Sequence, residues 1–585
     1  MGLILPTAAC AVVVYLIYQY ALYPVFVSPL RKLPAAHWTC HFCSLWILLA
    51  RKNKQENNSL FKAHLEYGPV VRIGPNEVSA DGVEAIRAIY QGGFEKGFWY
   101  TIFDNYGVPN MFSTSSSKSH SARKRMISNI YSKTFIQSSP ASHSQLSHVL
   151  FRRLIPSLYG RAEAKSNEVG DMDVGVKSHQ RSARNHHDVE VFGLFLAAAM
   201  DLITAYIFGL SNGTNFIDDE SHRQSWQKMY LARANYPFWP QEVPALTAFC
   251  SRWMPWFRLY PKWVDESNED LGQWNRDLCE KAKQATSEEA KQNLQATDNE
   301  TDAADEPVVY NALHAGIDRE WRTNGEKSLL YSTSILERDP AVASELMDHS
   351  LAGQETTGVA LTYATWHLSK IPELQEELRA EIMSVAASMK LDHGSIPDNT
   401  NARPTLPDPK TLDALPLLNA VIMETLRLHA PIPGPQPRQT PKDGCHIGGH
   451  RIPGGVRIAS SAHSLHRDAR VYLQPEEWIP SRWLQPKANN IEGAELKEWE
   501  ERRREMHRNF WAFSSGGRMC IGSNFAVNEM KYMLAAIYAN FKTTVVDDEG
   551  IEQEDAYTAK PLSERLVLRF HSLETKTAAG GGSDC

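Results

Sequence analysis

A single cysteine at the end of a glycine-rich loop is the feature that most constrains this chain. The loop is Phe513–Gly522 (FSSGGRMCIG), and the apolar run that follows, residues 524–538, indicates a helix. Glycines let the backbone turn tightly and approach a large flat group. A helix start presents unpaired N–H groups and positive dipole character, which favour a thiolate at Cys520. Arg518 could hold a carboxylate beside the same site. An ordinary buried cysteine at a loop–helix junction is the alternative interpretation.

A long apolar segment upstream places an acid next to an alcohol. Residues 340–369 contain few helix breakers and predict one helix, whose middle reads AGQETT from Ala352. The small pair Ala352 and Gly353 would let a flat ring press on the helix. Glu355 beside Thr356 provides a proton path into an otherwise dry cavity, because the carboxylate and the hydroxyl can both carry protons. A threonine can also bond the preceding turn's carbonyl and distort the helix locally. A close-packed core helix is the alternative.

Two further segments carry charges that could form one network. An apolar helix predicted over residues 415–429 places Glu424 and Arg427 on one helical face. A Glu-x-x-Arg pair alone is common and usually means a surface ion pair. Here Trp478–Trp483 (WIPSRW) follows and adds Arg482. Burying such charges is tolerable only if the network is complete.

These segments, in this order, resemble the cytochrome P450 family. The loop around Cys520 is similar to the family's haem-binding signature, and the AGQET stretch is similar to its oxygen-activation motif. The Glu-x-x-Arg and Pro-x-Arg-Trp segments also fit. The resemblance covers about residues 60–570 and implies a mainly α-helical fold with small β-sheets, preceded by a transmembrane helix.

The resemblance implies a role for each site residue. Cys520 would be the axial thiolate of a haem b iron, a ligand that favours O–O cleavage. Glu355 and Thr356 would deliver protons, and Glu424, Arg427 and Arg482 would form the structural triad that fixes the cysteine loop. The expected haem-binding residues are His120, Lys124, Arg438, Phe513, Arg518 and Gly522. The family usually has Trp and Arg where this chain has His120 and Lys124, so the donors are kept while the chemical groups differ.

Composition excludes some classes of protein and some partners. The 585 residues have a formal net charge of -7 and no sustained basic stripe, which argues against nucleic-acid binding. Eight cysteines show no disulfide spacing and fit a reducing compartment. The chain has no flavin or nicotinamide fingerprint. The resemblance therefore implies electrons from NADPH through a separate cytochrome P450 reductase, with cytochrome b5 as a further candidate donor.

The N-terminus predicts a membrane anchor. Residues 3–27 are almost uncharged and apolar, about the ~20 residues that a spanning helix needs. Arg31 and Lys32 follow and place the rest of the chain in the cytosol. A cleaved signal peptide is the alternative, but no basic region precedes the apolar stretch. Microsomal members of the family have a similar anchor and proline hinge, which implies a single-pass protein of the endoplasmic reticulum membrane.

The predicted organisation is an anchor and hinge over residues 1–34, a haem domain over 35–572 and a disordered tail over 573–585. The implied reaction inserts one oxygen atom from O2 into an apolar small molecule, by hydroxylation or epoxidation. A likeness to fungal members suggests a tailoring step in secondary-metabolite biosynthesis. Two alternatives stay open: a desaturase, ring-coupling or rearrangement enzyme without net oxygen insertion, and a non-enzymatic haem-binding membrane protein.

Overall fold

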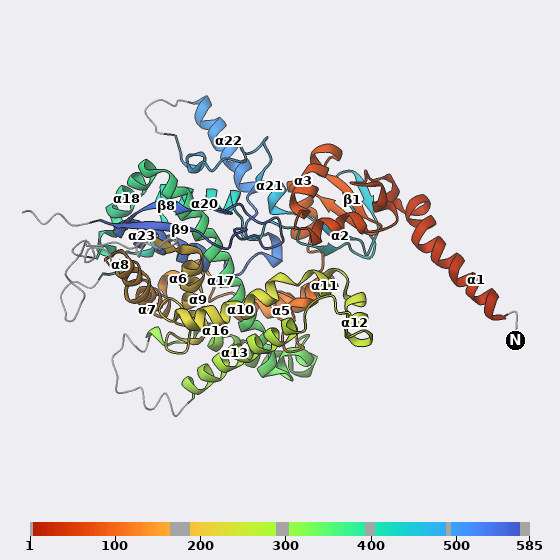
Figure 1. Ribbon diagram of the computed structural model, residues 1–585, viewed down its shortest axis with the longest axis horizontal. Helices are drawn as coiled ribbons and strands as arrows, with labels where there is room; N and C mark the ends of the chain where they lie inside the picture. Colours follow the sequence, from red (N-terminus) through yellow and green to blue (C-terminus); the bar gives the residue numbers. More distant parts are fainter. Residues whose placement is uncertain (1–3, 164–187, 288–302, 392–403, 487–492, 574–585) are drawn as a thin grey trace, which may run out of the picture.

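The computed structural model describes residues 4–163, 188–287, 303–391, 404–486 and 493–573. The predicted tail therefore lies outside the described residues, apart from its first position. Helices make up most of the molecule, and a smaller part built on short strands lies beside α2 and α3, where α1 leaves the body (Figure 1). This arrangement confirms the predicted mainly α-helical fold with small β-sheets.

The longer helices within the described residues are α1 (Ile4–Ile17), α2 (Leu45–Lys52), α3 (Glu56–Tyr67), α5 (Ser117–Ile127), α7 (Pro140–His148), α8 (Ile155–Glu163), α9 (Val191–Phe208), α10 (Glu220–Asn235), α12 (Pro244–Trp253), α13 (Trp263–Ala285), α16 (Val308–Asn324), α17 (Arg338–Lys370), α18 (Pro372–Ala386), α20 (Pro416–Leu428), α22 (Ala494–Asn509) and α23 (Ser523–Asn540). Shorter ones are α4 (Val83–Ile86), α6 (Lys133–Ser138), α11 (Phe238–Glu242), α19 (Pro409–Asp413) and α21 (Ala462–His466).

The strands form three small sheets. Their bounds are β1 (Val70–Gly74), β2 (Glu77–Ala80), β3 (Asp188–Glu190), β4 (Arg438–Gln439), β5 (Cys445–Ile447), β6 (His450–Ile452), β7 (Arg457–Ala459), β8 (Phe541–Asp547) and β9 (Val567–Ser572). The largest sheet has the order β1-β2-β7-β4; β2 pairs with β7 in parallel, and the other two pairings are antiparallel. The order β3-β9-β8 and the hairpin β5-β6 complete the set.

Two helices form the centre of the helical part. Helix α9 is buried along its whole length, and α17 packs against it. Their close approach depends on glycines of α17: a Cβ at Gly353 would lie 2.8 Å from Ile203 Cγ1, and one at Gly358 would lie 2.7 Å from Leu196 Cδ2. The predicted long helix is confirmed, and it starts at Arg338, two positions before the expected residue 340.

The N-terminal apolar segment stands apart from the body. Helix α1 continues into a π-helical stretch, Tyr18–Val27, and its described side chains are mostly exposed, among them Val14 at 66% and Phe26 at 66% (Figure 1). Among the described helices, α9 is long and apolar enough to cross a membrane, but it is 94% buried in the core. The protein core therefore accounts for α9, and the exposed N-terminal helix remains the candidate anchor.

Candidate active site

The cysteine loop is held tightly by its own backbone and by one glycine. The Cys520 N–H donates to the Phe513 carbonyl at 3.0 Å and closes the loop on itself. Gly516 has a φ of +72°, and a Cβ there would lie 2.3 Å from the Tyr90 carbonyl oxygen, so a side chain does not fit. Helix α23 begins directly after its N-cap, Gly522. The loop thus holds the sulfur just in front of a helix start, as predicted.

The surroundings of Cys520 act on the pKa of its thiol in opposite directions, and the net effect raises it, so the helix start alone does not produce the expected thiolate. Burial raises the pKa of the thiol, whereas the N–H groups of Gly522 and Ser523 and the ammonium group of Lys124 lower it. The Cys520 side chain is nevertheless exposed. A raised pKa together with an exposed side chain is expected for a residue that lies deep in the protein and lines an internal cavity. A coordinated metal ion would remove the remaining proton.

One face of α17 opens toward the cysteine. Most of the helix between residues 341 and 365 is buried, but Ala352 is exposed, and Asp348, Glu355 and Thr356 are partly exposed. Spacings of three and four residues place these side chains on one face. Asp348 is close enough to Cys520 to raise the pKa of its thiol. The exposed face of α17 therefore looks across the cavity at the sulfur.

The structure corrects one detail of the predicted ring contact. Ala352 is on the open face of α17, but Gly353 packs against Ile203 of α9. The two small residues therefore have separate functions. Gly353 leaves room for the neighbouring helix, and the contact of Ala352 with a flat ring stays a prediction.

The acid and the alcohol have different partners. Thr356 Oγ1 donates to the Ala352 carbonyl at 2.9 Å, the backbone bond considered from the sequence. Glu355 Oε2 lies 2.5 Å from the hydroxyl of Tyr230 on α10. Burial raises the pKa of Glu355, while the Tyr230 bond and Lys560 lower it. A carboxyl group with a raised pKa can take up and release a proton nearer to neutral pH.

Four cations and a histidine crowd one side of the cavity. Burial, Arg518, Lys96, Lys124 and Arg438 together lower the pKa of His120 to about 3. Burial and the neighbouring Arg438 lower the pKa of Arg518 to about 10, and burial holds the pKa of Lys96 well below its usual value. Within the described residues, none of these groups forms an ion pair with a carboxylate. Such a cluster needs an anion, and the two propionates of a haem would supply it.

The cationic side chains are oriented by carbonyl and hydroxyl oxygens. Arg438 Nη1 donates to the Tyr100 hydroxyl at 2.8 Å, and Arg518 Nη1 donates to the Thr114 carbonyl at 2.7 Å. Lys96 Nζ donates to the Phe112 carbonyl at 2.5 Å. These bonds leave further N–H groups of the arginines and the lysine available to an anion.

Lys124 is placed differently from the other donors. Its Nζ donates to the carbonyls of Gly517 and Met519, both at 3.1 Å. The lysine thus ties α5 to the cysteine loop and lies near the sulfur, where it lowers the pKa of the Cys520 thiol. Its predicted contact with a propionate stays a prediction.

The structural triad is assembled in the interior. Glu424 and Arg427 form a bidentate pair at 2.8 and 2.9 Å, and Arg482 Nε donates to Glu424 at 3.0 Å. Glu424 also accepts the Ile479 N–H and the Trp483 Nε1–H. The side chains of Glu424 and Arg427 are fully buried. The sequence-predicted residues therefore meet as one network whose central carboxylate is saturated with donors.

His466 connects this network to the cysteine loop. Its Nε2 accepts the Trp511 N–H at 2.8 Å, so its Nδ1 carries the proton and donates to the Arg427 carbonyl at 2.8 Å. Burial and Arg427 lower the pKa of His466 to about 3, which keeps the ring neutral as this arrangement requires. Trp511 lies just ahead of the cysteine loop, so the triad positions the loop through His466.

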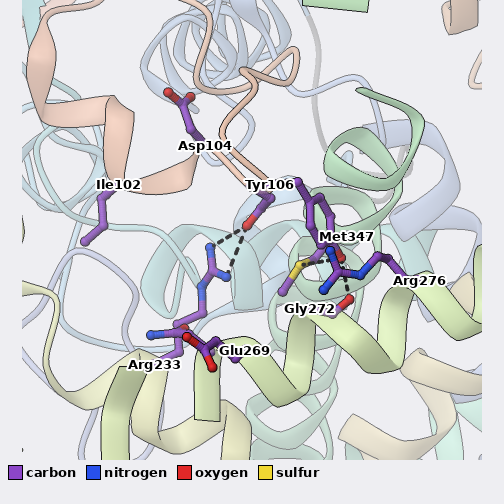
Figure 2. Close-up of a pocket in the computed structure, with 10 residues that line it drawn as sticks. Ile102, Asp104, Tyr106, Arg233, Glu269, Gly272, Arg276 and Met347 are labelled. Carbon is purple, nitrogen blue, oxygen red and sulfur yellow. Dashed lines mark hydrogen bonds between the residues drawn. The ribbon is translucent and has the colours of Figure 1, made fainter. Parts of the chain in front are cut away.

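A polar pocket lies at the distal side of α17. Its volume is about 330 Å³, and residues 102–106, α10, α13 and Met347 of α17 line it (Figure 2). Arg233 donates to Asn105 Oδ1 at 3.1 and 3.2 Å, and the Tyr106 hydroxyl donates to the Gly272 carbonyl at 2.7 Å. Arg233 and Tyr106 thus join the loop, α10 and α13 around this pocket.

Sequence reasoning missed three functional candidates: Lys96, Tyr230 and His466. Lys96 is the one basic residue in an aromatic stretch (FEKGFWY), which could have marked it as a buried cation. Tyr230 carries no comparable local signal, since its partner Glu355 lies 125 positions away. His466 lies in a segment, residues 464–468, that resembles the family, but sequence reasoning assigned it no role, since its partner Trp511 lies 45 positions away.

The site as a whole fits a haem. It offers an exposed sulfur ligand, an open face of α17 and, at one edge, cations that form no ion pair with a carboxylate in the described part of the chain. Cys520 would hold the iron of a haem, because its side chain is exposed at the end of its loop.

Comparisons with known proteins agree with this geometry. Residues 37–565 match the family model "Cytochrome P450". Cytochrome P450 monooxygenase avaI of Aspergillus versicolor is 26% identical over 79% of this chain and 92% of its own length. Tryprostatin B 6-hydroxylase of Aspergillus fumigatus is 25% identical over 94% of this chain and 81% of its own length. Cytochrome P450 monooxygenase FGM1 of Gibberella zeae is 25% identical over 91% and 90%, respectively.

These relatives are fungal oxidoreductases, and the family uses a haem-thiolate centre, dioxygen, a redox partner and small-molecule substrates. The family match covers most of the chain, and the structure has the cysteine loop, the triad behind it and the acid–alcohol helix that this family has. The chain therefore belongs to the cytochrome P450 monooxygenase family.

Proposed function

We propose that this protein is a membrane-anchored haem b monooxygenase that inserts one oxygen atom from O2 into an apolar small molecule. The balanced reaction consumes one O2, one NADPH and one proton, and it yields the oxygenated product, water and NADP+. Bound haem supplies the iron at which dioxygen is activated. The electrons come from NADPH through cytochrome P450 reductase, with cytochrome b5 as a further candidate donor.

The observation that carries the proposal is the acid–alcohol pair on the open face of α17. Glu355 has a raised pKa and lies beside Thr356 on the face that looks at Cys520. Glu355 takes protons from the distal side and passes them to the cavity, and Thr356 holds a hydroxyl at its edge. A protein that only carries haem would have no use for this pair, and rearrangement without oxygen insertion would not need its protons.

The chain's other site residues hold the cofactor and its ligand in place. The His120, Lys96, Arg438 and Arg518 groups bind the propionates, and Phe513 and Gly522 shape the loop that presents Cys520. The triad and His466 fix this loop from behind. The carboxylate binding by the cations relieves their mutual repulsion, so the cofactor also stabilises the fold.

We place the protein in the endoplasmic reticulum membrane, with α1 as a single-pass anchor and the catalytic domain in the cytosol. The exposed apolar side chains of residues 13–27 and the following Arg31 and Lys32 support this placement. The fungal relatives, one of which is named as a tryprostatin B hydroxylase, support a tailoring step in secondary-metabolite biosynthesis.

The test compares metabolites of the native host carrying either the intact chain or Cys520→Ala. We expect the variant to accumulate a compound that is one oxygen atom lighter than the missing product. A difference of two hydrogens, or none, would instead favour desaturation, coupling or rearrangement. Unchanged metabolites with both proteins present would contradict the proposed monooxygenase.

A further inference from the structure

A tyrosine of α10 reaches the carboxylate that we assign to proton delivery. Tyr230 Oη lies 2.5 Å from Glu355 Oε2, and both side chains are partly buried. Burial and Glu355 hold the pKa of Tyr230 well above its usual value, so the hydroxyl keeps its proton and donates it. The bond therefore stabilises the ionised form of Glu355 against the effect of burial.

The position of the hydroxyl is fixed by an aromatic stack. The Tyr230 ring stacks on Trp226, one turn earlier in α10, with ring centroids 5.3 Å apart and an interplanar angle of 9°. Trp226 is buried and also contacts Trp274 of α13 at 5.4 Å. Helix α10 packs along α13, and α13 packs on α17. The Trp226–Tyr230 stack therefore fixes the position of the Tyr230 hydroxyl relative to α17.

A second set of hydrogen bonds also holds α10 in place. Arg233, one turn after Tyr230, donates to Asn105 Oδ1, and Asn105 donates its amide N–H to the Ser344 carbonyl of α17. Figure 2 shows Arg233 reaching from α10 toward the loop that carries Tyr106. A displacement of α10 from α17 would therefore break the Arg233 bridge and the Tyr230–Glu355 bond together.

We infer that Tyr230 is a positioning residue for Glu355, and that proton delivery depends on α10 being held close to α17 by this hydrogen bond. Tyr230 touches the acid and acts through it. With α10 held close to α17, Glu355 is oriented and the Tyr230 bond keeps its pKa lower than burial alone would make it. With α10 displaced, the carboxyl group loses its donor and binds its proton more tightly. The inference rests on the proposed function, since it deepens the role of the same acid.

The electrostatic surroundings of Glu355 define what the test must separate. Besides Tyr230, the groups that act on Glu355 are Lys560, which lowers its pKa, and Glu554 and Glu564, which raise it. All three come from the segment between β8 and β9 and are unchanged by a substitution in α10. A shift caused by Tyr230→Phe is therefore attributable to the lost hydroxyl.

The experiment uses the haem-loaded full chain in lipid nanodiscs with its reductase. Hydrogen peroxide released per NADPH is measured against pH without added substrate, because reduced O2 leaves as hydrogen peroxide when the protons that O–O cleavage requires are not delivered. We expect an inflection that Glu355→Gln abolishes. Tyr230→Phe should move it to higher pH by about one unit, the effect of losing one hydrogen bond to a charged group. On the Glu355→Gln background, Tyr230→Phe should have no further effect.

Tyr236→Phe is the matched control. Tyr236 caps the same helix and packs on Trp263, and within the described residues its hydroxyl makes no hydrogen bond. Its pH profile should equal that of the intact chain. An unmoved inflection in Tyr230→Phe, or an equal shift in the Glu355→Gln background, would overturn the inference.

Hydrogen exchange tests the contact independently of turnover. Amides of residues 226–235 should exchange faster in Tyr230→Phe than in the intact chain or Tyr236→Phe. Equal exchange in all three would also overturn the inference. An intact chain that consumes no NADPH would contradict the proposed function, while the exchange data would still decide whether α10 is held by this bond.

Discussion

Two glutamates, Glu424 behind the cysteine loop and Glu355 on α17, have contrasting surroundings. Glu424 accepts five N–H donors: two from Arg427 and one each from Arg482, Ile479 and Trp483. Glu355 accepts one hydrogen bond within the described residues, from Tyr230, and burial raises its pKa. A carboxylate that is saturated with donors is a fixed charge, and one with a single donor can titrate.

The difference separates the two tasks of the protein. Behind the cysteine loop, the Glu424 network and His466 hold the sulfur in one position. On the α17 side, the proposed function requires Glu355 to gain and lose a proton in each turnover, which a saturated network would prevent. Substitutions behind the loop should therefore change haem retention, whereas substitutions on the open face of α17 should change chemistry at normal haem content.

Arg482→Ala should have the largest effect. It leaves the buried Glu424 carboxylate short of one partner, and breaking a buried ion pair costs roughly 3–5 kcal/mol. We expect little or no haem in the purified variant, measured as haem per polypeptide. Arg470→Ala is the control, because Arg470 pairs with Asp468 at the surface and its side chain is 87% exposed. Normal haem content in Arg482→Ala would remove the distinction drawn here.

Gly516→Ala should have the next largest effect on haem binding. The substitution places a side chain at a φ of +72° and 2.3 Å from the Tyr90 carbonyl oxygen, so the cysteine loop has to move. Strain and overpacking together should cost about 2–4 kcal/mol and speed haem loss. The measurement is the rate of haem transfer to apomyoglobin. Gly97→Ala is the control, since its added Cβ meets no atom within 4 Å and its backbone is extended; equal rates would contradict the expected strain.

Glu355→Gln should leave haem content unchanged and slow the reaction. General acid–base catalysis contributes at least about 100-fold, so product formation should fall by about that factor while hydrogen peroxide release rises. Glu337→Gln, an exposed glutamate just before α17, should behave like the intact chain. Loss of haem from Glu355→Gln would show that the two sides of the cavity are not separable.

The sequence predicted the parts of the site whose chemistry requires a fixed local spacing. Three such groups each span only a few residues of the sequence. They are Cys520 with the glycines of its loop, the adjacent Glu355 and Thr356, and the Glu-x-x-Arg pair. The structure brings Glu424, Arg427 and Arg482 together as expected. The helical fold and the long helix α17 also follow from local patterns.

Contacts between distant segments could not be predicted in this way. Tyr230 reaches Glu355 across 125 positions and Lys96 joins a cluster built from four segments, so neither has a local pattern. Side-chain direction was also beyond the sequence: Lys124 bonds the cysteine loop, and Gly353 faces α9 although its neighbour Ala352 faces the cavity. Packing decides these details.

The smallest expected effect is a change in pH dependence at His466. Its pKa is about 3 in the folded protein and 6.5 ordinarily, so between these values the unfolded chain binds one more proton than the folded one. The contribution of His466 to stability is therefore intact above pH 6.5 and is lost as pH falls, by about 1.4 kcal/mol per pH unit. In His466→Gln this part of the slope should disappear, although the variant is less stable at every pH because the Trp511 and Arg427 bonds change. Urea unfolding of the haem-loaded protein at pH 4.5 to 6, at about half-unit steps, measures the slope. Equal slopes in the two proteins would mean that His466 is protonated in the folded state, and the neutral bridge between the triad and the cysteine loop would then be wrong.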